Sequence, residues 1–281
     1  MAVLSQNDHR FWEENGYVVI HHAVPRENLD AVVDAIWEFL GMHRDDPDDW
    51  YREPARIGRM VELYQHQALW NNRQYPHVYQ AFAEIFGTEK LWVSHDRANM
   101  KPPARADKPE WDRGGGLHWD LDFSHLPVQA RQMKVPKVQG VLYLTDTAEN
   151  QGGFICVPGF HRQCAQWVKT QPDPQKPDAN QFKPQARPIV GKAGDLVIWN
   201  SLLPHGNGRN TSDRIRLAQY ITMFPNQQTD EFERQTRIQR WKQHLPGWMG
   251  KGPKDRERKM YKDPAELTEL GNRLLGLELW G

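Results

Sequence analysis

Short apolar runs bounded by turn-forming residues occupy the middle of the sequence. They cover residues 137–146, 153–158, 196–199 and 214–224. β-Branched and aromatic residues are frequent in them, and runs of this length between glycine-containing turns are typical of buried strands. Turn residues gather at 150–152 and at 207–213. The sequence therefore predicts antiparallel strands joined by turns, with 207–213 closing a hairpin.

Helical patterns flank this region on both sides. Helices are predicted before it, with a short strand at 17–20 between the first two, and after it in a charged, helical C-terminal part. Helices are expected at 8–16, 26–40, 76–86, 229–244, 247–254 and 264–277. A single strand is predicted from 90 to about 100, where Lys101-Pro102-Pro103 ends it because proline cannot donate to a sheet. The charged 41–60 and the proline-rich 171–188 are predicted to be loops.

The chain of 281 residues is expected to form one domain, because β-barrel folds reach this size. That domain would comprise N-terminal helices at 8–86, a β core at about 90–225 and a helical extension at 226–281. The extension is expected either to clasp the core or to provide an oligomer contact.

Two residues that follow a glycine-rich turn at 114–116 are candidate metal ligands. In an extended segment, residues two apart point to the same side, so the His118 imidazole and the Asp120 carboxylate can reach one ion. A second imidazole, His205, follows the apolar run 196–199 and is expected at a strand end. Two histidines and one carboxylate leave other positions of an octahedral ion open, which is the ligand pattern of non-haem Fe(II) oxygenases.

The His-x-Asp spacing alone is not specific. It recurs at His43 and Asp45, which follow a helical pattern and run into the acidic stretch 46–49. Exposed histidines and aspartates are ordinary surface residues. This second copy is therefore predicted to be a solvated loop and not a metal site.

A basic residue lies close to the second histidine in the predicted hairpin. Arg216 is on the strand that returns beside His205. An arginine is a permanent cation that binds carboxylates through two parallel hydrogen bonds. An iron site with an adjacent carboxylate clamp indicates a dicarboxylate cosubstrate.

Several ordered motifs together resemble the phytanoyl-CoA dioxygenase family of Fe(II)/2-oxoglutarate-dependent oxygenases. The resemblance covers most of residues 8 to 225. Besides the His118/Asp120 pair and the 205–216 segment, it is carried by the stretches 11–20 (FWEENGYVVI), 100–103 (MKPP), 150–153 (NQGG) and 157–161 (VPGFH).

The resemblance implies a fold, a cofactor set and residue roles. The fold is a double-stranded β-helix, a jelly-roll of the cupin type with flanking helices. His118, Asp120 and His205 match the catalytic iron ligands, and Arg216 matches the arginine that binds the C5 carboxylate of 2-oxoglutarate. Arg97 and Val141 match positions that line the cosubstrate pocket. The implied cofactors are Fe(II), 2-oxoglutarate and O2, with C–H hydroxylation as the default outcome. Halogenation is not expected, because Asp120 occupies the position that a halide would need.

Two other classes of protein fit parts of this pattern. A non-catalytic, cupin-like binding module would keep the fold but would not need three ligands and a matched arginine. A zinc hydrolase uses histidine and carboxylate ligands with a bound water but has no use for a carboxylate clamp. Release of succinate in the presence of Fe(II) and 2-oxoglutarate separates an oxygenase from both.

Charge and hydropathy favour a small-molecule partner. Lys plus Arg and Asp plus Glu each number 36, so no net charge attracts nucleic acid or an anionic membrane. No apolar run approaches the ~20 residues that span a bilayer, and the first residues lack a signal-peptide pattern. The two cysteines, Cys156 and Cys164, are expected to be free thiols. The predicted location is cytoplasmic.

The strand predicted at 90–100 bears on the substrate. Alternation would put His95, Arg97 and Asn99 on one face. A face this polar is unsuited to an alkyl chain, so a small, polar, carboxylated substrate is predicted. The runner-up is an acyl-CoA, whose phosphates could meet the basic run 251–259. Acidic residues interleave that run, which favours a solvated helix face.

Overall fold

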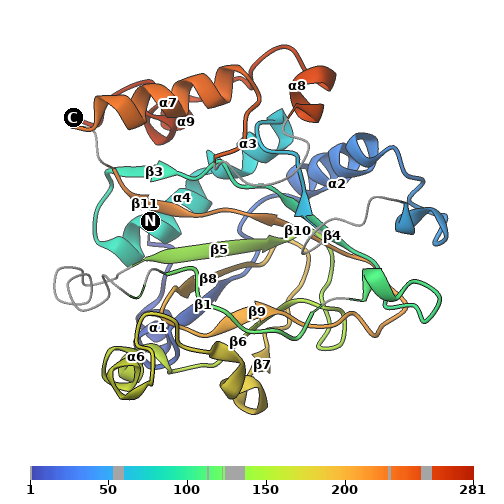
Figure 1. Cartoon of the computed structure of the whole chain (residues 1–281). Helices are drawn as coiled ribbons and strands as arrows, with labels where there is room; N and C mark the ends of the chain where they lie inside the picture. The colour runs from blue at the N-terminus through green and yellow to red at the C-terminus, as the bar shows by residue number, and fades with distance from the viewer. Residues whose placement is uncertain are drawn as a thin grey trace.

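Most strands belong to a large or a small antiparallel sheet in the computed structural model (Figure 1), and two more form a separate pair. The structure describes residues 2–52, 60–112, 114–121, 123, 137–226, 229–247 and 255–281. The strands are β1 (Tyr17–Ile20), β2 (Met60–Val61), β3 (Leu91–Val93), β4 (Ala98–Lys101), β5 (Val138–Tyr143), β6 (Phe154–Cys156), β7 (Arg187–Pro188), β8 (Leu196–Asn200), β9 (His205–Asn207), β10 (Arg216–Tyr220) and β11 (Met223–Pro225). The large sheet has the order β1-β8-β5-β10-β4-β2 and the small one β7-β6-β9, while β11 pairs with β3.

Eight α-helices and four short 3-10 helices are found in the described residues. The α-helices are α1 (Gln6–Asn15), α2 (Arg26–Leu40), α3 (Gln67–Arg73), α4 (Pro76–Phe86), α6 (His161–Trp167), α7 (Glu231–Lys242), α8 (Arg256–Met260) and α9 (Glu269–Leu275). The 3-10 helices are η1 (Asp49–Tyr51), η3 (Pro109–Trp111), η5 (Val168–Thr170) and η6 (Ala179–Gln185).

The two sheets enclose one apolar cluster, and the helices cover another on the outer face of the large sheet. The inner cluster includes Val141, Tyr143, Phe154, Cys156, Val197, Trp199 and Ala218, contributed by both sheets. The outer cluster includes Leu29, Ile36, Val78, Phe82, Leu142, Ile198 and Leu217, from α2, α4 and the opposite face of the same strands. Figure 1 shows β6, β7 and β9 below the large sheet, helices α2, α3, α4, α7 and α9 above it, and α1 and α6 beside the small sheet. This is the predicted jelly-roll with flanking helices.

Local signals explain several helix boundaries. Ser5 and Asp8 form a reciprocal capping box at the start of α1, and Gly16 ends that helix with a positive φ of 75°. The observed span of α2 is the predicted one, and its buried residues follow the predicted apolar stripe. Helix α4 begins at Pro76, as predicted, because proline suits the first helical turn.

The prediction of one strand from 90 to 100 was wrong. The chain forms β3 and β4, separated by residues 94–97, because β3 pairs with β11 and β4 with β10. The break changes the alternation, so the His95 ring packs against Trp70 of the outer cluster, with 5.8 Å between ring centroids. His95 therefore does not share a face with Arg97 and Asn99. Propensity could not reveal this break, since tertiary pairing decides it.

The predicted hairpin across 207–213 was also wrong. Strand β9 pairs with β6 in the small sheet, whereas β10 lies between β5 and β4 in the large one. The turn therefore carries the chain from one sheet to the other. Consequently Arg216 and His205 come from facing sheets and not from neighbouring strands.

Three further differences concern helices. Helices α3 and α6 were not predicted, and the 171–188 stretch contains η6 and β7 in place of a plain loop. The predicted helix at 247–254 lies almost wholly outside the described residues. The last predicted helix is shorter, as α9, because Thr268 caps its N-terminus.

A buried carboxylate ties the C-terminal part to the segment before α3. Glu257 accepts hydrogen bonds from the backbone N–H groups of Tyr64 (2.6 Å) and Gln65 (2.7 Å). His244 Nδ1 lies 3.4 Å from the same carboxylate, and His244 Nε2 lies 3.0 Å from the Asp263 carbonyl oxygen. Both His244 and Glu257 are buried. The described part of 226–281 thus packs onto the core, and none of its helices, nor any other described helix, is long and apolar enough to cross a membrane.

This contact predicts a pH-dependent stability. Burial alone would lower the pKa of His244, but the hydrogen bond and charge of Glu257 more than offset it and raise that pKa above its usual value. A raised folded-state pKa stabilises the protein below the unfolded pKa, and this contribution disappears as pH rises through the folded value. Asparagine tolerates the positive φ of 52° at this position, so His244→Asn removes the imidazole without straining the backbone. We expect it to lower the free energy of unfolding by roughly 1.5–3 kcal/mol at pH 6 and by less at pH 9.

Denaturant titrations of both proteins at the two pH values measure this difference. His43→Asn, at an exposed loop histidine, is the control. An equal loss at pH 6 and pH 9 would show that a charged His244 does not contribute.

Candidate metal centre

The two histidines predicted as metal ligands are joined by a pair of backbone hydrogen bonds. The His118 N–H donates to the His205 carbonyl (2.8 Å), and the His205 N–H donates to the His118 carbonyl (3.0 Å). The segment that carries His118 approaches β9 so closely that a Cβ atom at Gly206 would clash with the Gly116 carbonyl oxygen. Glycine at this position therefore permits the contact, and the two imidazole rings lie 4.6 Å apart.

Asp120 completes the cluster. One carboxylate oxygen lies 3.7 Å from His118 Nε2, and the other lies 3.5 Å from His205 Nε2. One ligand atom from each residue lies within 4.8 Å of the other two, and this is the one cluster of at least three His, Cys, Asp or Glu side chains with such spacing in the described part of the chain. His43 and Asp45 are not in it. The sequence-predicted set is therefore brought together, and its donors suit a divalent transition metal.

Neighbouring groups orient two of the three side chains. His205 Nδ1 lies 3.0 Å from the Leu203 carbonyl oxygen, so it carries the proton and leaves the Nε2 lone pair directed at the cluster. Gln139 donates to Asp120 Oδ2 at 2.9 Å, and the Ser201 hydroxyl donates to the Gln139 oxygen at 3.2 Å. Gln139 and Ser201 were not singled out from the sequence, because neither stands at ligand spacing from the histidines.

The electrostatics of the cluster favour metal binding. The neighbouring His205 and the hydrogen bond from Gln139 keep the pKa of Asp120 well below its usual value, against the opposing effect of burial. Burial lowers the pKa of His118, and the neighbouring His205 lowers it further. At neutral pH the cluster therefore offers a carboxylate and a neutral imidazole, the protonation states that bind a cation. The His118 and Asp120 side chains are about half exposed, whereas His205 is buried, so the cluster is accessible from one side.

Arg216 is fully buried on the inner face of β10, where it reaches across to the small sheet. Its guanidinium donates to Asn99 Oδ1 (2.6 Å) and to Asn207 Oδ1, and Asn207 also donates to the Tyr220 hydroxyl (3.0 Å). Its Nε atom has no acceptor in the described residues. No carboxylate in the described ranges forms an ion pair with Arg216. A buried cation without a charged partner is unfavourable, so an anionic ligand would stabilise it.

Asn207 was not predicted as a partner of Arg216, although its position in the sequence carries a signal. Asn207 stands two residues after His205, so in a strand both side chains point the same way. Asn99 was predicted on a polar face with Arg97, and its bond to Arg216 shows that the Asn99 side chain points into the space between the two sheets. The link between His205 and Arg216 thus runs through Asn207.

Arg97 and Val141, predicted from the resemblance to line the pocket, both lie beside Tyr220. Val141 is fully buried and stands opposite Tyr220 in the β5–β10 pairing. The Arg97 carbonyl accepts a hydrogen bond from the Tyr220 N–H (2.9 Å), which places Arg97 opposite Tyr220 on the other side. Arg97 Nε lies 3.5 Å from the Asp96 carboxylate.

Both cysteines are buried free thiols, as predicted. Burial raises the pKa of Cys164 to about 12, and it raises that of Cys156 as well. Neither is a reactive thiolate at neutral pH, which leaves the His and Asp cluster as the chemical centre.

Comparison with known proteins agrees with this geometry. The family model described as "Phytanoyl-CoA dioxygenase (PhyH)" matches residues 12–218. A 2-aminoethylphosphonate dioxygenase from an uncultured bacterium is 33% identical over 79% of this chain and 82% of its own length. The human peroxisomal phytanoyl-CoA dioxygenase is 22% identical over 77% of this chain and 67% of its own.

A solved structure supports the fold. It is the non-haem, α-ketoglutarate-dependent epimerase SnoN from nogalamycin biosynthesis, which superimposes with a TM-score of 0.54 at 14% identity over 78% of this chain and 80% of that one. With the family model covering well over half of the sequence, the chain belongs to the phytanoyl-CoA dioxygenase family of Fe(II)/2-oxoglutarate-dependent oxygenases and is an oxidoreductase of the dioxygenase type.

Proposed function

We propose that this enzyme couples the oxidative decarboxylation of 2-oxoglutarate to the hydroxylation of a small, polar, carboxylated metabolite. The observation that carries the proposal is Arg216, a buried cation without a carboxylate partner among the described residues, linked through Asn207 to the strand of His205. A zinc hydrolase or a simple binding module has no use for such a cation. A dicarboxylate cosubstrate requires one.

In this proposal His118, Asp120 and His205 hold Fe(II), and Arg216 holds the far carboxylate of 2-oxoglutarate. When bound, the iron would allow O2 to oxidise 2-oxoglutarate to succinate and CO2 with one oxygen atom and to hydroxylate the substrate with the other. Gln139 orients Asp120, and the Leu203 carbonyl sets the His205 tautomer. Val141 provides an apolar wall that excludes water. The whole chain is proposed to act as one oxygenase domain.

The pocket wall favours a polar substrate over an acyl-CoA. Arg97 and Asn99 lie near Tyr220 on the inner side of the large sheet, and burying such groups against an alkyl chain costs roughly several kcal/mol. A relative is named for 2-aminoethylphosphonate, a small charged compound. The acyl-CoA alternative rests on the human relative. The basic run 251–259, which would have to bind the CoA phosphates, is a poor phosphate site in its described part. Glu257 is buried there, and Lys259 already forms an ion pair with Asp255.

The metal assignment predicts that His205→Ala abolishes stoichiometric Fe(II) binding and iron-dependent turnover, because it removes one of three ligands. The readouts are metal content after anaerobic reconstitution and succinate formed from 2-oxoglutarate. His43→Ala is the matched control, since His43 has the same spacing to an aspartate but lies outside the cluster. Retention of iron and activity by His205→Ala would contradict the assignment.

The cosubstrate assignment predicts that Arg216→Ala raises the KM for 2-oxoglutarate about tenfold or more, because a charge-assisted contact worth roughly 1.5–3 kcal/mol is lost. Arg214→Ala, two residues earlier at an exposed position, should leave that KM unchanged. Fe(II) binding should survive in both variants. The opposite pattern, with only Arg214→Ala impaired, would move the clamp.

A further inference from the structure

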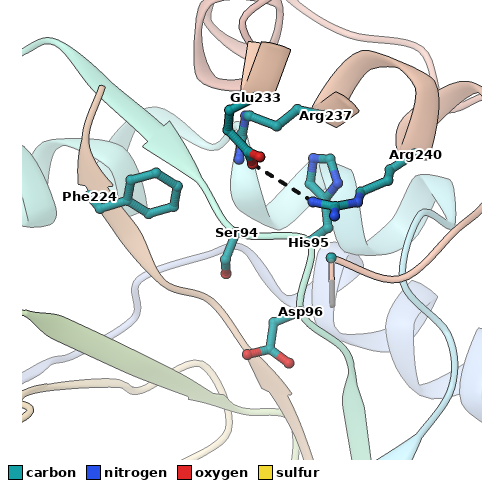
Figure 2. A pocket seen from close by; sticks show the side chains of 8 residues that line it. Ser94, His95, Asp96, Phe224, Glu233, Arg237 and Arg240 are labelled. Carbon is teal, nitrogen blue, oxygen red and sulfur yellow. Dashed lines mark ion pairs between the residues drawn. The ribbon is translucent and has the colours of Figure 1, made fainter. Parts of the chain in front are cut away.

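A cavity of about 170 Å³ lies between α7 and the β3–β11 pair. Residues 94–96, which separate β3 from β4, line one side of it, and three charged side chains of α7 line another, as Figure 2 shows. These three are Glu233, Arg237 and Arg240. Of the described residues that line this cavity, none belongs to the metal cluster. The cavity is therefore separate from the candidate metal centre.

A buried imidazole in the lining lacks a partner. His95 is 4% exposed, and its Nε2 atom is buried without a hydrogen-bond partner in the described part of the chain. A polar atom that leaves water without gaining a new hydrogen bond costs free energy. The His95 ring packs against Trp70 and also lines the cavity. A ligand in the cavity can therefore supply the missing hydrogen bond.

Arg240 brings a cation to the same cavity. Its Nη1 atom lies 3.7 Å from Glu233 Oε1, the ion pair drawn in Figure 2, which is longer than the roughly 2.7–3.2 Å of a hydrogen bond. The guanidinium carries five N–H donors and forms no hydrogen bond with another described residue. Arg237 differs, because its guanidinium donates to three backbone carbonyls. Arg240 is therefore the arginine of this cavity that is suited to a ligand.

Positive charge predominates around the His95 ring. Burial lowers the pKa of this imidazole, and three neighbouring arginines lower it further: Arg237, Arg73 and Arg240. The ring is therefore neutral at neutral pH, with one nitrogen as an N–H donor. Of the two described carboxylates in the lining, Glu233 reaches toward the α7 arginines, whereas Asp96 points away from them in Figure 2. The local field therefore favours an anion.

We propose that this cavity binds a small oxyanion, a carboxylate or a phosphate group, between the Arg240 guanidinium and the Nε2 atom of His95. The guanidinium would form charge-assisted hydrogen bonds with the anion, and the neutral imidazole would donate its Nε2–H. The volume is below the roughly 300 Å³ at which pockets for drug-sized molecules begin, so the ligand is small. The Arg240 and Glu233 side chains are 24% and 38% exposed, which lets an ion enter from solvent.

Calorimetric titration of the whole chain with sodium acetate and with sodium phosphate at neutral pH tests this site. Iron and 2-oxoglutarate are omitted, and sodium chloride keeps the ionic strength constant. Acetamide, a neutral compound with the shape of acetate, is the matched probe. We expect at least one oxyanion to bind with a Kd of about 1 mM or lower, and acetamide to bind about tenfold more weakly or less. The oxyanion that binds more tightly distinguishes a carboxylate ligand from a phosphate.

Variants locate the binding. Arg240→Gln should raise the Kd about tenfold or more, because it removes the cation and its donors. Glu233→Gln should lower the Kd, since Glu233 competes with the anion for Arg240. Lys242→Gln removes an exposed charge from the same helix and should change the Kd by less than about twofold. Arg216→Ala, which removes the other proposed anion site, should retain the binding.

Several results would overturn this inference. They are equal affinity for the oxyanions and acetamide, no binding of either oxyanion, and equal losses in Arg240→Gln and Lys242→Gln. An unchanged Kd in Glu233→Gln would also overturn it, and this variant decides the question where Arg240→Gln fails to fold. Loss of binding in Arg216→Ala would assign the anion to the proposed 2-oxoglutarate site instead. None of these results bears on the oxygenase reaction, which succinate formation tests separately.

Discussion

The site depends on the reciprocal hydrogen bonds between the His118 and His205 backbones. They fasten a segment outside the regular strands onto β9, so that two imidazoles separated by most of the β core come within 4.6 Å. Asp120 then follows at strand spacing and meets both rings. Without these hydrogen bonds nothing would hold His118 and Asp120 beside His205. The absence of a side chain at Gly206 allows the two backbones to approach this closely.

Buried arginines organise the rest of the interior. Arg73 and Arg237 donate to backbone carbonyls that link distant segments, and burial lowers their pKa values to about 10 and about 9. Arg216 differs because its partners are the side-chain amides of Asn99 and Asn207, on two facing sheets. Neutral amides solvate a cation without cancelling its charge. Arg216 is therefore suited to an anionic ligand, whereas Arg73 and Arg237 stabilise the fold through their bonds to backbone carbonyls.

The C-terminal part supports the core at a segment distant in sequence. Glu257 fixes the backbone at Tyr64 and Gln65, and the Arg73 guanidinium joins the Tyr64 carbonyl to the Asp96 carbonyl. Three separate stretches of sequence are thus held together around the break between β3 and β4.

The sequence by itself determined the local features of this protein. The periodicity of 26–40 sets α2, the short apolar runs set β5, β6 and β8, and the spacing of His118 and Asp120 identifies two of the three candidate metal ligands. Only the tertiary structure decided which strands pair. This pairing places β9 and β10 in different sheets and divides 90–100 into β3 and β4. It also directs the buried His95 ring toward Trp70 in the outer cluster. Strand pairing depends on side chains distant in sequence and on which face is buried, so local propensity cannot specify it. For the same reason Asn207 and Gln139 obtain their contacts with Arg216 and Asp120 only from the residues that the fold brings beside them.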